Sequence, residues 1–86
     1  MGYHILIADD ETEIRELLRL YLEKDGYTVW EAADGMEALA VLKQEKIDLA
    51  ILDIMMPSPD GWRVLQNIRK NSNIPVILLS ARSGDS

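Results

Sequence analysis

Residues 5–10 read Ile-Leu-Ile-Ala-Asp-Asp, four apolar residues followed at once by two carboxylates. The arrangement returns twice, because residues 49–53 read Leu-Ala-Ile-Leu-Asp and residues 76–80 read Val-Ile-Leu-Leu-Ser. Apolar runs without alternation are typical of strands buried on both faces of a parallel sheet. We therefore expect three central parallel strands, each followed directly by a polar side chain.

The segments between these runs have helical spacing, most clearly the one after Asp10. Its start can be capped by Thr12 or Asp10, and Gly26 is a suitable C-terminal stop. An i, i+3, i+4, i+7, i+8 pattern predicts that this helix buries one face. That face comprises Ile14, Leu17, Leu18, Tyr21 and Leu22.

The remaining segments complete an alternation of strands and helices. Residues 27–32 mix β-forming and polar residues, which favours an edge strand, and His4 is expected to be a partnerless surface residue at the start of the first strand. Asp34-Gly35 and Asp60-Gly61 each open a helix. The order β-α-β-α-β-α-β predicts an α/β fold with right-handed crossovers onto a mostly parallel sheet.

Length and composition limit the chain to one domain and exclude several functions. The 86 residues are 48% hydrophobic and carry a net charge of −6, which argues against nucleic acid or an anionic membrane surface as a partner. There is no cysteine, and the N-terminal residues do not resemble a secretion signal. No apolar stretch approaches the roughly 20 residues of a membrane-spanning helix. We expect a cytoplasmic protein.

The polar residues that follow the strands are the candidate site. In open α/β sheets, ligands bind beyond the carboxyl ends of the strands, where Asp9, Asp10, Asp53 and Ser80 all stand. If the first and third apolar strands are neighbours, three carboxylates share one crevice and repel one another unless a cation intervenes. Oxygen ligands without His or Cys favour a hard cation, and Mg²⁺ fits better than Ca²⁺ because no calcium-loop spacing is present.

Each of these residues also has a purely structural interpretation. An Asp-Asp pair before a helix suits an N-cap with a solvated neighbour, and Asp53 suits a turn before Pro57. Ser80 suits a cap or a turn in the same way. Position alone therefore leaves the purpose of the acidic cluster open.

Taken together, the motifs resemble the receiver domain of bacterial two-component response regulators. They are Asp9-Asp10, the segment from Asp53-Ile54-Met55-Met56-Pro57 to Asp60-Gly61, and Ser80-Ala81. The stretch from Ile74 to Arg82 is most similar to receivers joined to winged-helix transcription factors. The resemblance implies a flavodoxin-like, doubly wound parallel sheet of order 2-1-3-4-5.

The resemblance also implies a role for each site residue. Asp53 would be the phosphoacceptor for a sensor histidine kinase, in a domain that takes part in its own phosphorylation and dephosphorylation rather than in turnover catalysis. Asp9, Asp10, Asp53 and the backbone carbonyl of Met55 would bind Mg²⁺. The Ser80 hydroxyl would contact a phosphoryl oxygen and start the switch, with the backbone N–H groups of Met55 and Ala81 assisting.

Residues 1–86 are expected to form a truncated receiver domain. The chain stops where a fourth helix would begin, so the expected order is 2-1-3-4, without the fifth strand and the last two helices. The family's phosphoryl-binding lysine would lie in that part, and its loss would impair phosphotransfer. The exposed edge of the strand at 76–79 would then favour self-association or domain swapping.

Two rival functions follow from the same residues. A phosphatase of the haloacid-dehalogenase type also uses an aspartate nucleophile after a strand, but it needs a second acid two residues later, where this chain has Met55. The second rival is a folding or self-assembling fragment that keeps the metal pocket but performs no phosphotransfer.

Overall fold

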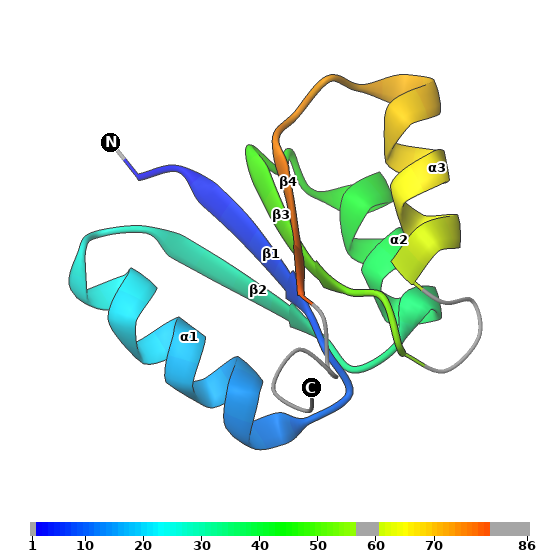
Figure 1. Ribbon diagram of the computed structural model, residues 1–86. Coiled ribbons are helices and arrows are strands. Elements are labelled where there is room, and N and C mark those ends of the chain that lie inside the picture. Colours follow the sequence, from blue (N-terminus) through cyan, green and yellow to red (C-terminus); the bar gives the residue numbers. More distant parts are fainter. Residues whose placement is uncertain (1, 57–60, 80–86) are drawn as a thin grey trace.

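The computed structural model describes residues 2–56 and 61–79 (Figure 1). Strands and helices alternate along the chain, as the sequence predicts. The elements are β1 (His4–Ala8), α1 (Thr12–Lys24), β2 (Thr28–Ala32), α2 (Gly35–Gln44), β3 (Leu49–Asp53), α3 (Gly61–Asn71) and β4 (Val76–Leu79).

The four strands form one parallel sheet in the order β2-β1-β3-β4. β1 therefore lies between β2 and β3, and the register aligns Ala8 with both Ala32 and Leu52. This order confirms the incomplete flavodoxin-like fold. It also makes β1 and β3 neighbours, the condition on which the predicted crevice depends.

Helices cover both faces of the sheet (Figure 1). Side chains alternate between the faces along each strand. In β1, Leu6 and Ala8 belong to the cluster that packs against α2 and α3, whereas Ile5 and Ile7 belong to the cluster beneath α1. All four are at most 2% exposed, so β1 is buried on both sides, as its unbroken apolar run predicts.

The prediction for the buried face of α1 is partly wrong. Leu18 and Leu22 pack against the sheet, but Leu17 is 51% exposed and Tyr21 is 62% exposed. Among the described elements, α1 is the helix that covers this face, so the side of the helix that carries Leu17 and Tyr21 has no neighbour to pack against.

The start of α1 also differs from the expectation. Neither Thr12 nor Asp10 caps it: Glu11 is the N-cap residue and makes no side-chain capping hydrogen bond. The Glu11 N–H instead donates to Oδ1 of Asp9 at 2.8 Å. The Asp9 turn therefore precedes the helix, which begins at Thr12. At the other end, Gly26 has a φ of 92° and stops the helix as predicted.

The other two helices begin where the sequence places them. Asp34 caps α2 by accepting a hydrogen bond from the Glu37 N–H at 2.9 Å. Gly61 is the first residue of α3, whose Val64 and Ile68 are buried.

β4 is an edge strand of the described sheet, not a central one. Ile77 is 49% exposed and Leu78 is 39% exposed, although they point to opposite faces. α1 packs on β1 and β2, and α3 packs on β3, so β4 extends beyond the main area that both helices cover. The apolar run at 76–79 therefore does not mark a strand buried on both faces here. β4 is the exposed edge of the described sheet that is expected when the fifth strand is missing.

His4 has partners, contrary to the prediction. Its Nδ1 accepts a hydrogen bond from Nε1 of Trp30 at 3.1 Å, and the two rings are stacked with centroids 6.1 Å apart. Its backbone N–H donates to Oδ2 of Asp48 at 2.8 Å. These partners are 26 and 44 residues away, so local sequence could not reveal them. None of the described helices is long and apolar enough to span a membrane.

Candidate functional site

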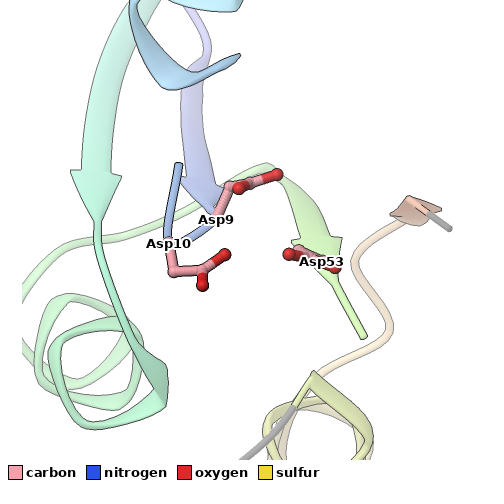
Figure 2. Close-up of side chains that lie close together, drawn as sticks. All are labelled: Asp9, Asp10 and Asp53. Atoms are coloured by element: carbon pink, nitrogen blue, oxygen red, sulfur yellow. The ribbon is translucent and has the colours of Figure 1, made fainter. Parts of the chain in front are cut away.

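The carboxylates of Asp9, Asp10 and Asp53 meet at the carboxyl edge of the sheet. Ala8 pairs with Leu52, so the residues that follow them, Asp9 and Asp53, lie level across the two central strands. One carboxylate oxygen from each of the three aspartates lies within 4.8 Å of the others. Figure 2 shows the three side chains gathered around the space between the end of β1 and the end of β3.

Asp9 is held in place from several sides. Its backbone N–H donates to the carbonyl of Ala32 at 3.0 Å, which joins the end of β1 to the end of β2. Its Oδ1 accepts from the Glu11 N–H. The residue is only 5% exposed, which is unusual for an aspartate. The turn interpretation is thus correct for one oxygen of Asp9, but it does not explain why the group is buried beside two other acids.

The electrostatics of the cluster favour a positively charged ligand. Burial raises the pKa of the Asp9 carboxyl above its usual value, and the negative charges of Asp53, Asp10 and Glu11 raise this pKa further. The hydrogen bond from the Glu11 N–H counteracts part of the rise. A cation that enters the cluster would relieve this repulsion, and oxygen-only ligands suit a hard divalent ion.

Asp53 ends β3 and is 4% exposed. Its Oδ1 accepts a hydrogen bond from the N–H of Met55 at 2.9 Å, which fixes the orientation of the carboxylate relative to the following turn. The Met55 side chain is itself 52% exposed, so the backbone of this residue contacts the site while its side chain points away from the core.

Gly61 permits a close contact between the start of α3 and the backbone at Asp53. A Cβ at this position would lie 2.5 Å from the carbonyl oxygen of Asp53 and 2.7 Å from Cα of Ile54. Both distances are far below a normal van der Waals contact. The first turn of α3 therefore rests directly on the backbone that carries Asp53, and no side chain fits between them.

Arg15 is a residue of the site region that sequence reasoning missed. Its Nη1 donates to the backbone carbonyl of Asp9 at 2.7 Å, and its Nε donates to Oε1 of Glu31 at 2.9 Å. In the sequence Arg15 is an ordinary polar position of an amphipathic helix. Its partner Glu31 is 16 residues away in β2, so the two meet because α1 packs on β2.

Two predicted site residues, Ser80 and Ala81, lie outside the described residues. The partner of Asp53 in β4 is Leu79, the residue immediately before Ser80. A separate groove of about 770 Å³ lies between α2 and α3. Its lining contains Met36, Lys43 and Asn67 but none of the three clustered aspartates, so this groove is separate from the acidic cluster.

Comparisons with known proteins agree on one family. The response regulator receiver domain family matches residues 5–86. The chain is 49% identical over 86 residues to the response regulator GtcR of Aneurinibacillus migulanus and 44% identical over 82 residues to the transcriptional regulatory protein ResD of Bacillus subtilis. These matches cover 100% and 95% of this chain but only 36% and 34% of the relatives, so the chain spans about a third of their length.

Solved structures show the same relationship. The response regulator TrrA of Thermotoga maritima, determined in complex with Mg²⁺ and BeF, superposes with a TM-score of 0.86 at 44% identity. That match covers 94% of this chain and 71% of the other. A CheY-like receiver domain of Methanospirillum hungatei gives a TM-score of 0.89 at 30% identity, covering 99% and 69%. The chain belongs to the receiver domain family of two-component response regulators, which are signalling modules.

Proposed function

We propose that Asp53 accepts a phosphoryl group from a sensor histidine kinase in a Mg²⁺-dependent reaction. In this proposal Asp9, Asp10, Asp53 and the backbone carbonyl of Met55 bind the ion. The observation that carries it is the convergence of three carboxylates, two of them buried, within 4.8 Å at the carboxyl edge of the sheet. The TrrA complex with Mg²⁺ and BeF supports the choice of ion and of phosphoryl chemistry.

The donor set fits Mg²⁺. Magnesium typically takes one or two carboxylates directly, retains several waters and leaves positions for phosphate oxygens. Asp10 is exposed while Asp9 and Asp53 are buried, so the cluster is open on one side for water and a phosphoryl group. When bound, the ion would neutralise charge on the carboxylates and on the phosphoryl oxygens.

The residues of the chain would supply the nucleophile and its orientation. A carboxylate oxygen of Asp53 would attack phosphorus while the bond from phosphorus to the kinase histidine nitrogen breaks, leaving an acyl phosphate on Asp53. The Met55 N–H already donates to Oδ1 of Asp53 and so holds the carboxylate in one plane. Ser80, through its hydroxyl, and Ala81, through its N–H, are proposed to bind the phosphoryl oxygens and to start the switch.

Beryllofluoride, a mimic of the phosphoryl group, provides the test. We expect Mg²⁺ with beryllofluoride to shift the NMR resonances of residues around Asp53 and to change tryptophan fluorescence in the wild-type chain. Asp53→Asn, which has nearly the same shape, should show no such response. An equal response in Asp53→Asn, or none in the wild type, would refute the phosphoacceptor assignment.

The exposed β4 edge favours a second candidate function, self-association. Ile77 and Leu78 leave apolar surface open beside β4 backbone that, within residues 2–56 and 61–79, pairs only with β3, and such an edge is a template for pairing with another chain. We expect light scattering after size exclusion to give a mass that rises with concentration. Ile77→Lys should lower that mass, whereas Leu20→Lys, at an equally apolar and 66% exposed position of α1, should not. A concentration-independent monomer in the wild type would rule out this function.

A further inference from the structure

Arg15 connects three parts of the molecule around the acidic cluster. It lies in the first turn of α1, and its side chain is only 14% exposed. Its Nη1 contacts the Asp9 carbonyl oxygen, its Nε contacts Glu31 near the end of β2, and its Nη2 lies 3.4 Å from Oγ1 of Thr12. A partly buried guanidinium with donors in fixed directions can hold these groups in one arrangement better than a flexible ammonium could.

The contact with the Asp9 carbonyl is the important one for the site. That carbonyl belongs to the peptide group that joins Asp9 to Asp10, so its orientation sets the direction in which both side chains leave the backbone. The Asp10 side chain makes no hydrogen bond within the described part of the chain and is exposed. Arg15 is therefore a direct restraint on the peptide that carries this carboxylate.

Arg15 does not act mainly as a nearby positive charge. Its guanidinium forms an ion pair with Glu31, and Glu31 also pairs with Arg19. A positive charge close to a cation site would by itself repel Mg²⁺. The two effects of Arg15 on Mg²⁺ affinity are therefore opposite: holding the Asp9 carbonyl would strengthen binding, and the positive charge would weaken it. Removing Arg15 should weaken binding if positioning dominates and strengthen it if charge dominates.

We propose that Arg15 is a positioning residue for the Mg²⁺ site, holding the Asp9 carbonyl so that the Asp9 and Asp10 carboxylates converge on the ion. The inference rests on the proposed function, because it assumes that these carboxylates bind Mg²⁺. Outer partners of metal ligands typically change metal affinity by about 10–100-fold when they are replaced. We expect an effect of about tenfold here, at the lower end of that range, because Asp9 keeps its other hydrogen bonds.

The test compares Mg²⁺ affinity by calorimetric titration of the whole chain in four forms. The wild type should bind Mg²⁺, Arg15→Gln should bind about tenfold more weakly, and Arg15→Lys should show partial rescue because it can still donate to the carbonyl. Arg19→Gln is the matched control. It removes a positive charge from the same network and breaks a contact to Glu31, but it does not touch Asp9.

Two further readouts separate positioning from a general loss of fold. Thermal unfolding without Mg²⁺ should be similar for Arg15→Lys and Arg19→Gln, while the backbone amide resonance of Asp10 should shift only in the Arg15 variants. If Arg15→Gln fails to fold, Arg15→Lys against Arg19→Gln still decides the question.

The possible failures are distinguishable. Unchanged or tighter Mg²⁺ binding in the Arg15 variants, with normal binding in the wild type, would overturn the positioning role alone. An equal loss in Arg19→Gln would also overturn it, because the effect would then belong to the ion-pair network as a whole. Absence of Mg²⁺ binding in the wild type would overturn the proposed function and this inference together.

Discussion

The sheet face covered by α2 and α3 holds a cluster of ten buried hydrophobic residues, whereas the face covered by α1 holds a cluster of four. α3 alone contributes buried Val64 and Ile68, but α1 contributes no buried residue. The acidic cluster lies at the edge of this unequal sandwich. Asp53 lies two residues after Ile51 in β3, so its side chain points to the same face of the sheet, the one covered by α1.

The difference teaches that stability and chemistry are largely separated in this domain. One face supplies most of the buried apolar contact. The other carries Asp9 and Asp53, which are buried, while the neighbouring exposed Asp10 leaves the cluster open to an incoming ion or phosphoryl donor. Four changes, taken from the largest expected effect to the smallest, can break or sharpen this comparison.

The largest contrast should come from truncating one apolar side chain in each helical layer. Ile68→Ala on α3 removes a side chain that is 3% exposed and should lower the free energy of unfolding by about 2–5 kcal/mol. Leu17→Ala on α1 removes one that is 51% exposed and should change it by less than about 0.5 kcal/mol. Urea unfolding measures both. Similar losses in the two variants would show that α1 contributes as much as the other layer.

The next effect should come from Gly61, at the contact between α3 and the site. Gly61→Ala places a methyl group against the Asp53 carbonyl, so the backbone must shift, and the loss should be about 1–3 kcal/mol. Gly26→Ala is the control, since it strains a positive φ without any crowding. Both variants should unfold earlier in urea, but only Gly61→Ala should also alter the beryllofluoride response. A normal response would mean that the contact serves packing alone.

Replacing Asp9 should have a smaller effect on stability, and it should stabilise the fold rather than destabilise it. Its folded-state pKa is raised, mainly by burial, so its contribution to stability is greatest below the unfolded pKa and is lost as pH rises through the folded pKa. At neutral pH without Mg²⁺, Asp9→Asn should therefore raise the melting temperature. Millimolar Mg²⁺ should raise it in the wild type but much less in the variant. An unchanged wild-type melting curve with Mg²⁺ would count against the metal pocket.

The smallest effect should be that of Glu31. Burial alone would raise its pKa, but hydrogen bonds and charges from Arg19 and Arg15 lower it overall. Its stabilising contribution is thus present above the unfolded pKa and is lost as pH falls through the folded one, the reverse of Asp9. Glu31→Gln should cost about 1 kcal/mol or less at neutral pH. Unfolding curves of the variant and the wild type should differ at neutral pH. The difference between the two proteins should shrink at acidic pH, because acid protonates Glu31 in the wild type.

Much of the fold follows from local signals. The unbroken apolar runs place β1 and β3, Gly26 ends α1, and Asp34 caps α2, because each of these depends on the residue itself and its near neighbours. The convergence of Asp9, Asp10 and Asp53 was predictable to the same degree, because adjacent β1 and β3 bring together the aspartates at their carboxyl ends. The roles given to Ser80, Ala81 and the Met55 carbonyl stay predictions.

The rest depends on contacts between distant parts of the chain. Helical periodicity predicts that Tyr21 lies on the buried face of α1, but it cannot tell whether a second element covers that part of the helix. The apolar run in β4 likewise cannot reveal that the described sheet ends there. The Arg15–Glu31 contact needs α1 to pack on β2, and the His4–Trp30 contact needs β1 to pair with β2, so neither contact has a local sequence signature.

The two tryptophans, Trp30 and Trp62, can serve as intrinsic fluorescence probes of two different parts of the molecule. Trp62 is half exposed and directly follows Gly61, whose backbone touches the peptide of Asp53, so its emission should respond to events at the acidic cluster. Trp30 is instead engaged by the imidazole of His4 and packs against the larger core. Trp30→Phe would isolate the signal of the site and Trp62→Phe that of the scaffold, without any added label.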